Sequence, residues 1–315
     1  MCFRAWIQII MHVHIVMMMS VVPTSNLHIR RGESASLICV FQEVDKTTTI
    51  RWKSAKEGFL TSGTTIYNHI NNIEVQKPTQ HDWTLIIKKV DNRFAGVYTC
   101  ETNTGKIISN YTLEIVDGPR INLDNSSDSQ ETCSEGSTHE LYCHFRGNPT
   151  PTVRWYRGLK NAVDTGITGE ILRLPSVSRY ASDTYICEGK NFVNSRNYTI
   201  DLQVNFPVEV DVMEEVIKVQ VGAVVSLVCA VEGQPIKEGY WRDPQGKTII
   251  SGWKFNVTAE KDGDFPVQYI TATSQVGALL STDFGDYTCV GEGDSNSASK
   301  VTRLVQSESA SDVIN

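Results

Sequence analysis

The feature that most constrains this chain is a cysteine pattern that occurs three times. Each copy begins with a cysteine in an apolar segment, has a tryptophan 12 or 13 residues later, and ends with a cysteine preceded by Tyr-x. The three sets are Cys39, Trp52, Tyr98 and Cys100; Cys143, Trp155, Tyr185 and Cys187; and Cys229, Trp241, Tyr287 and Cys289. Because the copies follow one another over most of the 315 residues, they indicate three small domains of one kind.

This pattern resembles the immunoglobulin fold, in which a disulfide joins two sheets beside a buried tryptophan and a tyrosine hydroxyl fastens one corner. We therefore predict an all-β protein of three tandem immunoglobulin-like β-sandwiches in an elongated rod. The resemblance implies three disulfides, Cys39–Cys100, Cys143–Cys187 and Cys229–Cys289. Their separations of 61, 44 and 60 residues leave room for extra edge strands in the outer domains and predict a compact middle domain.

Prolines mark the expected joints between the domains. Asp117-Gly118-Pro119 and Asn205-Phe206-Pro207 each follow an alternating final strand, and proline interrupts a strand ladder. The predicted domains are 23–117 (V-like), 118–206 (I/C2-like) and 207–306 (I-like), followed by a disordered tail over 307–315. Because both linkers are short, we expect stiff connections between the domains.

The first residues predict a secretory signal peptide over 1–22. An almost uninterrupted apolar run from Ala5 to Met19 follows Arg4, and it is shorter than the roughly 20 residues that a membrane-spanning helix needs. At the other end, 307–315 has small residues but no apolar tail, so we expect no lipid anchor and no membrane span in the mature chain. The expected location is extracellular, with the chain either secreted freely or held at the cell surface by a partner.

Further segments resemble lachesin and the IgLON neural adhesion proteins. The most specific is Asp82–Ile87 with its Trp-x-Leu-x-Ile strand, and Gly147–Trp155 and Val221–Cys229 are similar to the second and third domains of that family. The first domain departs from the family pattern at Phe94, where an Asp usually stands, whereas Asp283 keeps that position in the third. The resemblance implies a three-domain cell-recognition protein.

Four Asn-x-Ser/Thr sequons predict glycosylation of a secreted chain, at Asn110, Asn125, Asn197 and Asn256. Asn110 and Asn197 both lie ten residues after the second cysteine of their domains, so they occupy the same structural position. If Leu113 and Ile115 face the core, alternation turns Asn110 outward on the sheet formed by strands C, F and G.

The resemblance places partner binding on the outer face of this C–F–G sheet in the first domain. Alternation from Trp52 and from Cys100 assigns outward positions on strands C and F, and neighbouring apolar residues extend the face. The candidate partner-binding residues are Arg51, Lys53, Phe59, Leu60, Thr99, Glu101 and Ile108. An apolar centre flanked by charges suits a modest protein–protein interface. The alternative for each residue is an ordinary solvated face or a partly buried edge.

Cys133 has no counterpart in the repeat and leaves an odd number of cysteines after the signal peptide. It lies ten residues before Cys143, in the expected first strand of the middle domain. A buried free thiol, an intermolecular bridge and a local variant pairing all remain open.

Composition and motifs exclude several classes of function. The formal net charge of -7 and the pI near 5.5 disfavour nucleic acid as a partner. The sequence contains no His-Glu-x-x-His, no Gly-x-Ser-x-Gly and no phosphate-binding glycine loop, so we expect no enzyme, no cofactor and no metal.

Two hypotheses follow. The first is an extracellular adhesion or recognition protein that binds itself or another immunoglobulin-type chain through the first domain. The alternative is a secreted, soluble immunoglobulin-type protein that binds a ligand or serves immune recognition.

Overall fold

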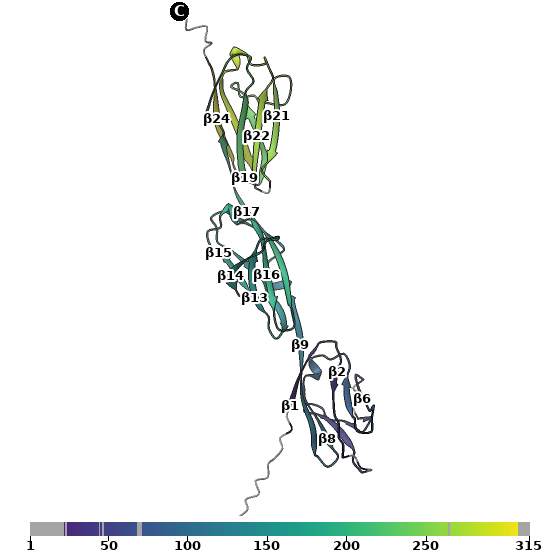
Figure 1. Ribbon diagram of the computed structural model, residues 1–315. Helices are drawn as coiled ribbons and strands as arrows, with labels where there is room; N and C mark the ends of the chain where they lie inside the picture. Colours follow the sequence, from purple (N-terminus) through teal and green to yellow (C-terminus); the bar gives the residue numbers. More distant parts are fainter. Residues whose placement is uncertain are drawn as a thin grey trace, which may run out of the picture. The chain divides into compact units, whose positions relative to one another are not determined.

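The computed structural model describes Val22, Asp45 and residues 24–43, 47–67, 71–263 and 265–307. This part of the chain consists of β-strands, loops and four short 3-10 helices, with no α-helix (Figure 1). None of its helices is long and apolar enough to cross a membrane. The strands form three sandwiches of the immunoglobulin type. The expected signal peptide and most of the expected C-terminal tail lie outside the described residues.

The first sandwich has two sheets that enclose one core. The larger sheet has the order β1 (Thr24–Arg30), β9 (Ile107–Ile121), β8 (Gly96–Thr102), β3 (Ile50–Ser54), β4 (Gly58–Ser62) and β5 (Thr65–Ile66). The smaller sheet has the order β2 (Ala35–Leu37), β7 (Thr84–Ile87) and β6 (Ile73–Gln76). Alternating apolar residues of both sheets, such as Leu37, Leu85 and Leu113, are buried between them.

The second sandwich again has a larger and a smaller sheet. One sheet contains β14 (Val163–Thr168), β13 (Thr152–Arg157), β16 (Asp183–Lys190), β17 (Ser195–Val212) and β10 (Gln130–Ser134). The other sheet pairs β11 (His139–Tyr142) with β15 (Ile171–Leu174). A further short strand, β12 (Phe145–Asn148), precedes β13.

The third sandwich begins on the second half of β17. There, β17 pairs with β19 (Ser226–Gln234), which is followed in the sheet by β22 (Val267–Ser274) and β21 (Phe255–Lys261). The opposite sheet has the order β18 (Val216–Val219), β24 (Ser297–Gln306), β23 (Gly285–Gly293) and β20 (Ile236–Arg242). The second and third sandwiches therefore share a strand, and most of the second lies in the same compact unit as the third.

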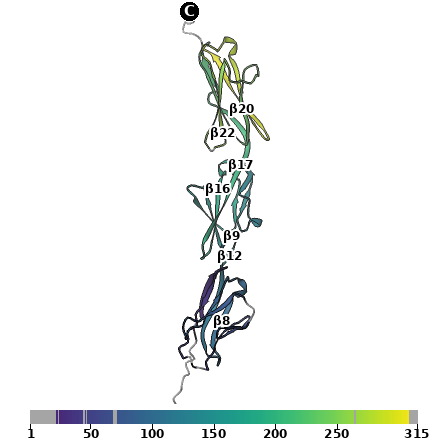
Figure 2. The same cartoon turned by 90° about the vertical axis from the view of Figure 1, so that its right-hand side faces the viewer.

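Pro207 does not break this shared strand. Up to Leu202, β17 pairs with β16, and from Phe206 it pairs with β19, with a register shift between Phe206 and Glu209. The proline lies where the strand changes partners, so its missing N–H costs no ladder bond. Figures 1 and 2 both show β17 passing from the second sandwich into the third.

Each sandwich contains one disulfide between its two sheets. Their Cα separations of 6.3, 6.5 and 6.4 Å fall within the usual range for disulfides. The three pairs are Cys39–Cys100, Cys143–Cys187 and Cys229–Cys289. Cys133 is a free, half-buried thiol in β10 that packs against the core of the second sandwich, and burial raises its pKa. In the described part of the chain Cys133 forms no disulfide, so the local variant pairing is absent.

The three repeated tryptophans lie fully buried beside the disulfides, and each indole N–H donates to a backbone carbonyl. The bonds are Trp52 to Trp83 (2.7 Å), Trp155 to Gly169 (2.9 Å) and Trp241 to Ile270 (3.0 Å). Trp83, the residue that most specifically marks the first domain, thus supplies the acceptor for the core tryptophan.

The three repeated tyrosines make the same corner bond. Each hydroxyl donates to the carbonyl four residues earlier, at the end of a 3-10 turn. The bonds are Tyr98 to Phe94 (2.7 Å), Tyr185 to Ala181 (3.0 Å) and Tyr287 to Asp283 (2.8 Å). The sequence repeat therefore corresponds to a repeated set of hydrogen bonds as well as to repeated strands.

Candidate recognition face of the first domain

The candidate site is the outer face of the larger sheet of the first sandwich, formed by β4, β3, β8 and β9. These strands correspond to C′, C, F and G of the immunoglobulin fold. Strand pairing arranges the outward side chains in rows across the sheet. One row runs Phe59, Lys53, Thr99 and Asn110, and the next contains Arg51, Glu101 and Ile107. We refer to these seven residues together with Val97 as the recognition face.

Phe59 lies between two cations on this face. The residue is 41% exposed, and the guanidinium of Arg51 and the ammonium of Lys53 lie 4.5 and 5.6 Å from the ring centroid. Such cation–π contacts hold a partly exposed aromatic ring in a defined orientation. The Phe59 ring is therefore exposed to solvent while Arg51 and Lys53 hold its orientation.

Arg51 is fixed in turn by the neighbouring strand. Its Nη2 donates to Oε1 of Glu101 at 3.1 Å and to the carbonyls of Thr102 and Asn103 at 3.3 Å. The side chains of Arg51 and Glu101 are only 26% and 14% exposed, so solvent screens this ion pair less than one on an open surface. The pair joins β3 to β8 and orients the guanidinium over Phe59.

Two exposed aliphatic side chains extend the face and were not among the expected residues. Val97 on β8 is 42% exposed and Ile107 on β9 is 44% exposed. Counting back from Cys100 beyond Thr99 would have placed Val97 outward, because alternation holds along β8. Alternation does not place Ile107 outward, because the register between β8 and β9 shifts at Cys100 and Glu101.

Ile108 is not exposed on this face, contrary to expectation. It is partly buried and packs against the core of the first sandwich. The register of β8 and β9 shifts here, since Cys100 pairs with Ser109 whereas Glu101 pairs with Ile107. This bulge leaves Ile108 as the extra residue, so that Ile107 takes the outward position.

Leu60 is a second correction, because it belongs to the core and is only 2% exposed. A bulge is again the cause: Trp52 pairs with Thr61 and Lys53 pairs with Phe59, so Leu60 is the extra residue of β4. Phe59 points outward as expected, whereas Leu60 and Thr61 are both buried.

A shallow pocket of about 260 Å³ lies at one end of the face. It is lined by Phe41, Gln42, Glu43, Lys106, Ile107 and Ile108. The Lys106 ammonium donates to Glu43 at 2.8 Å and lies 5.1 Å from the centroid of the Phe41 ring. This hydrogen bond lowers the pKa of Glu43. The face therefore ends in a mixed apolar and charged rim.

The four sequons all lie at accessible positions. Asn125, Asn197 and Asn256 are exposed, and Asn110 is half-exposed. On β9, Asn110 pairs with Thr99 of β8 on one side and with Thr24 of β1 on the other. A glycan at Asn110 would therefore cover β9 and β1 at the level of Thr99 and Thr24 and leave β3 and β4 open.

The arrangement suits binding through side chains and offers no reactive group. In the part of the chain that the structure describes, no group of three His, Cys, Asp or Glu side chains is placed to hold a metal ion. The recognition face combines an aromatic ring, two aliphatic side chains and paired charges, which is the composition of protein–protein contact sites.

Comparisons with known proteins show which proteins the chain is similar to. An immunoglobulin domain model matches residues 119–191. The limbic system-associated membrane protein of Rattus norvegicus is 25% identical over 269 residues, covering 85% of this chain and 75% of that protein. Lachesin of Drosophila melanogaster is 26% identical over 239 residues, covering 73% of this chain and 65% of that protein.

Two solved structures show the same fold. One is a crystal structure of Dpr2 Ig1-Ig2 in complex with DIP-Theta Ig1-Ig3, with a TM-score of 0.72 and 22% identity over 91% of this chain and 98% of the matched chain. The other is the ectodomain of mouse nectin-like molecule 4, with a TM-score of 0.63 and 19% identity over 91% of this chain and 99% of that chain.

Proposed function

Because this chain is an IgLON-like protein of the immunoglobulin superfamily with three immunoglobulin domains, we propose that it acts in extracellular cell recognition or adhesion. In this proposal it binds another immunoglobulin-type chain, or a second copy of itself, through the recognition face of the first domain. The match of residues 119–191 to an immunoglobulin domain model supports a role in binding.

The observation that carries the proposal is the exposed ring of Phe59 between Arg51 and Lys53. Aromatic and arginine side chains are enriched at the energetic centres of interfaces, where a rigid ring loses little conformational entropy on binding. Val97 and Ile107 add apolar area on the neighbouring strands, and each is more than two fifths exposed. A partner that covers Phe59 would also desolvate the Arg51–Glu101 pair, which adds specificity for a complementary surface.

The position of Asn110 limits where a partner can bind. It lies in the same row as Thr99, Lys53 and Phe59, at the opposite side of the sheet from Phe59. With a glycan at Asn110, a partner is confined to β3 and β4 and to the neighbouring row of the face, in which Ile107 lies on β9. This geometry favours an edge of the partner over broad face-to-face stacking of two whole sheets.

An immunoglobulin-type partner and an extracellular location are supported by the related proteins. The Dpr2 and DIP-Theta chains of the same fold form a complex of two immunoglobulin-type proteins. The rat relative is named a membrane protein. We propose that this chain acts outside the cell, because disulfides persist in oxidising compartments and its four accessible sequons are acceptors for glycosylation there.

Analytical ultracentrifugation of the glycosylated protein over a wide concentration range tests the proposal, together with a binding screen against immunoglobulin-type ectodomains. We expect either dimerisation that depends on concentration or capture of an immunoglobulin-type partner, and loss of that binding in Ile107→Asp. Val301→Asp is the matched control, because Val301 is 43% exposed on β24 of the third sandwich.

A strictly monomeric protein that captures no immunoglobulin-type chain would contradict the proposal and favour a soluble ligand-binding role. Equal binding by Ile107→Asp and the wild type would place the interface elsewhere.

A further inference from the structure

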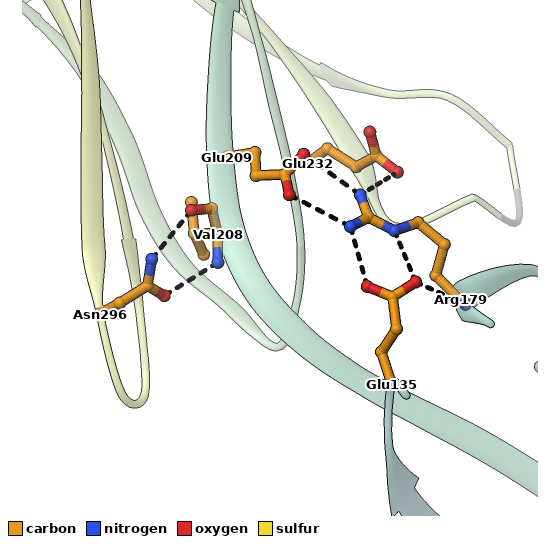
Figure 3. A network of polar contacts seen from close by, with 6 residues as sticks. All are labelled: Glu135, Arg179, Val208, Glu209, Glu232 and Asn296. Atoms are coloured by element: carbon orange, nitrogen blue, oxygen red, sulfur yellow. Dashed lines mark hydrogen bonds and ion pairs between the residues drawn. The ribbon is translucent and has the colours of Figure 1, made fainter. Parts of the chain in front are cut away.

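The junction between the second and third sandwiches contains a polar network centred on Arg179, which the proposed function does not use (Figure 3). Arg179 begins the 3-10 turn Arg179–Ala181 of the second sandwich, and its side chain is only 17% exposed. Three glutamates surround its guanidinium: Glu135 of the second sandwich, and Glu209 and Glu232 of the third.

Every N–H of this guanidinium has an acceptor. Nε and Nη2 donate to the two carboxylate oxygens of Glu135 at 3.0 and 2.9 Å. Nη2 and Nη1 donate to the two oxygens of Glu209 at 3.1 and 3.3 Å, and Nη1 donates to Glu232 at 3.2 Å. Two bidentate pairs fix the carboxylates of Glu135 and Glu209 in both distance and orientation, and a single hydrogen bond holds Glu232.

The carboxylates would repel one another without Arg179. Glu209 and Glu232 are direct cross-strand partners on β17 and β19, a position where like charges are destabilising. Glu135 approaches them from the other sandwich. Removing the cation therefore does more than delete hydrogen bonds, because it leaves a repulsion that acts between the two domains.

Two further contacts hold the same stretch of β17. The Cζ of Arg179 lies 4.3 Å from the ring centroid of Phe206, which is 5% exposed. Two residues later, the backbone N–H and carbonyl of Val208 bond to the side-chain amide of Asn296 at 2.8 and 2.9 Å (Figure 3).

Three glycines of the third sandwich allow the close fit around Val208. A Cβ at Gly233, Gly291 or Gly293 would lie 2.7 or 2.8 Å from the Val208 side chain, closer than packed atoms can approach. The sequence thus keeps side chains away from the residue at which β17 enters the third domain.

Apolar packing leaves the part of the junction beside Arg179 open. A cavity of about 370 Å³ lies beside Arg179, and the aromatic rings of Tyr180 and Phe265 on its wall are 69% and 62% exposed. Domains joined by a small apolar contact move relative to one another unless another interaction restrains them.

We propose that Arg179 and Asn296 clamp β17 at the junction, so that the second and third sandwiches move as a single rigid body. The clamp is a device of the fold, independent of the recognition face. Its effect is to transmit orientation and force between the two domains without a hinge.

Single-molecule energy transfer on the full glycosylated chain tests the clamp. Dyes are attached through non-natural amino acids at Arg173 and Ala259, which are exposed on the second and third sandwiches. We expect one narrow distribution of distances for the parent chain and loss of that single narrow peak in Arg179→Ala. Arg303→Ala is the control, since Arg303 makes a bidentate pair with Asp286 inside the third sandwich.

Two further variants separate the clamp from a general folding defect. Glu135→Gln in the Arg179→Ala background removes the repulsion between the domains, and we expect it to narrow the distribution again in part. Glu209→Gln alone keeps the Arg179–Glu135 pair and weakens only the contact to the third domain, so we expect an intermediate width. Hydrogen exchange of the Val208 amide should quicken in Asn296→Ala.

A broad distribution in the parent chain, or a single narrow one in Arg179→Ala, would overturn the proposal.

Discussion

The first and third sandwiches have separate cores built from the same pattern of cysteine, tryptophan and tyrosine, but they differ on the outer face of the corresponding sheet. At the position before the buried tryptophan, the first has Arg51 and the third has Tyr240. Arg51 lies against Phe59, which is 41% exposed and has no polar group. In the third, the Tyr240 hydroxyl donates to Glu292 at 2.8 Å and accepts from Arg242 at 2.8 Å.

This difference indicates which face is suited to binding. The network of Tyr240, Glu292 and Arg242 satisfies its own polar groups and presents a solvated surface. The face of the first sandwich leaves apolar area unpartnered and holds it in place with charges. The repeated cysteines, tryptophan and tyrosine therefore explain the fold of both domains, whereas the outward residues between them decide the role of each face.

The largest expected effect tests whether the two cores are equivalent. Trp52→Ala and Trp241→Ala each remove a fully buried indole, and each should lower the free energy of unfolding of its own domain by about 3–5 kcal/mol. Hydrogen exchange resolved by domain measures both losses. A large loss of unfolding free energy in only one variant would show that the two cores differ in stability although they contain the same repeated residues.

The next effect concerns the corner where the first and third sandwiches differ. Asp283 is buried, pairs with Lys254 and accepts from the Leu280 N–H at 2.8 Å, whereas Phe94 takes its place in the first sandwich. Asp283→Ala should destabilise the third domain by about 3 kcal/mol, because it leaves a partly buried ammonium without its partner.

Asp91→Ala is the control for this prediction. Asp91 pairs with the exposed Arg93 in the first sandwich, so its loss should lower the free energy of unfolding far less than the loss of Asp283 does. Thermal unfolding of the two variants compares them, and equal shifts would show that the Asp283 pair is no stronger than a surface pair.

A third prediction tests a property that the two corners share. Burial raises the pKa of Tyr98 to about 12, and it also raises the pKa of Tyr287. Because the folded pKa of Tyr98 lies above its unfolded value of 10.0, its contribution is complete below pH 10 and is lost as the pH rises through 12.

The free energy of unfolding of the first domain should therefore fall by about 2 to 3 kcal/mol over that range. Tyr98→Phe should remove this dependence, at a cost near 1 kcal/mol at neutral pH for the lost bond to Phe94. Denaturant unfolding between pH 8 and 12 measures how the free energy of unfolding changes with pH. The same pH dependence in Tyr98→Phe as in the parent chain would contradict its attribution to Tyr98.

The sequence predicts the fold more completely than it predicts the site, and particular residues show why. Cys39, Trp52 and Tyr98 are fixed by spacing and local alternation, which sequence displays directly. Leu60 and Ile108 were misplaced because each is the extra residue of a β-bulge, and a bulge changes the alternation without an obvious sequence signal.

The clamp at the second junction could not have been predicted at all. The carboxylates of Glu135, Glu209 and Glu232 lie far apart in the sequence and contact Arg179 only in the folded chain. Pairing of residues so far apart follows from tertiary structure, and charge pattern along the chain gives no sign of it.

The most direct test of the central claim compares partner affinity in Phe59→Ala and Tyr240→Ala, two aromatic truncations on corresponding faces. Affinity is measured by ultracentrifugation if the chain dimerises, or by surface plasmon resonance with a captured immunoglobulin-type partner, after circular dichroism has shown native folding. Phe59→Ala should weaken binding by about 2 kcal/mol, or roughly 30-fold, whereas Tyr240→Ala should change it by less than about 0.5 kcal/mol. Unchanged affinity in Phe59→Ala, or a larger loss in Tyr240→Ala, would contradict the assignment of recognition to the first domain.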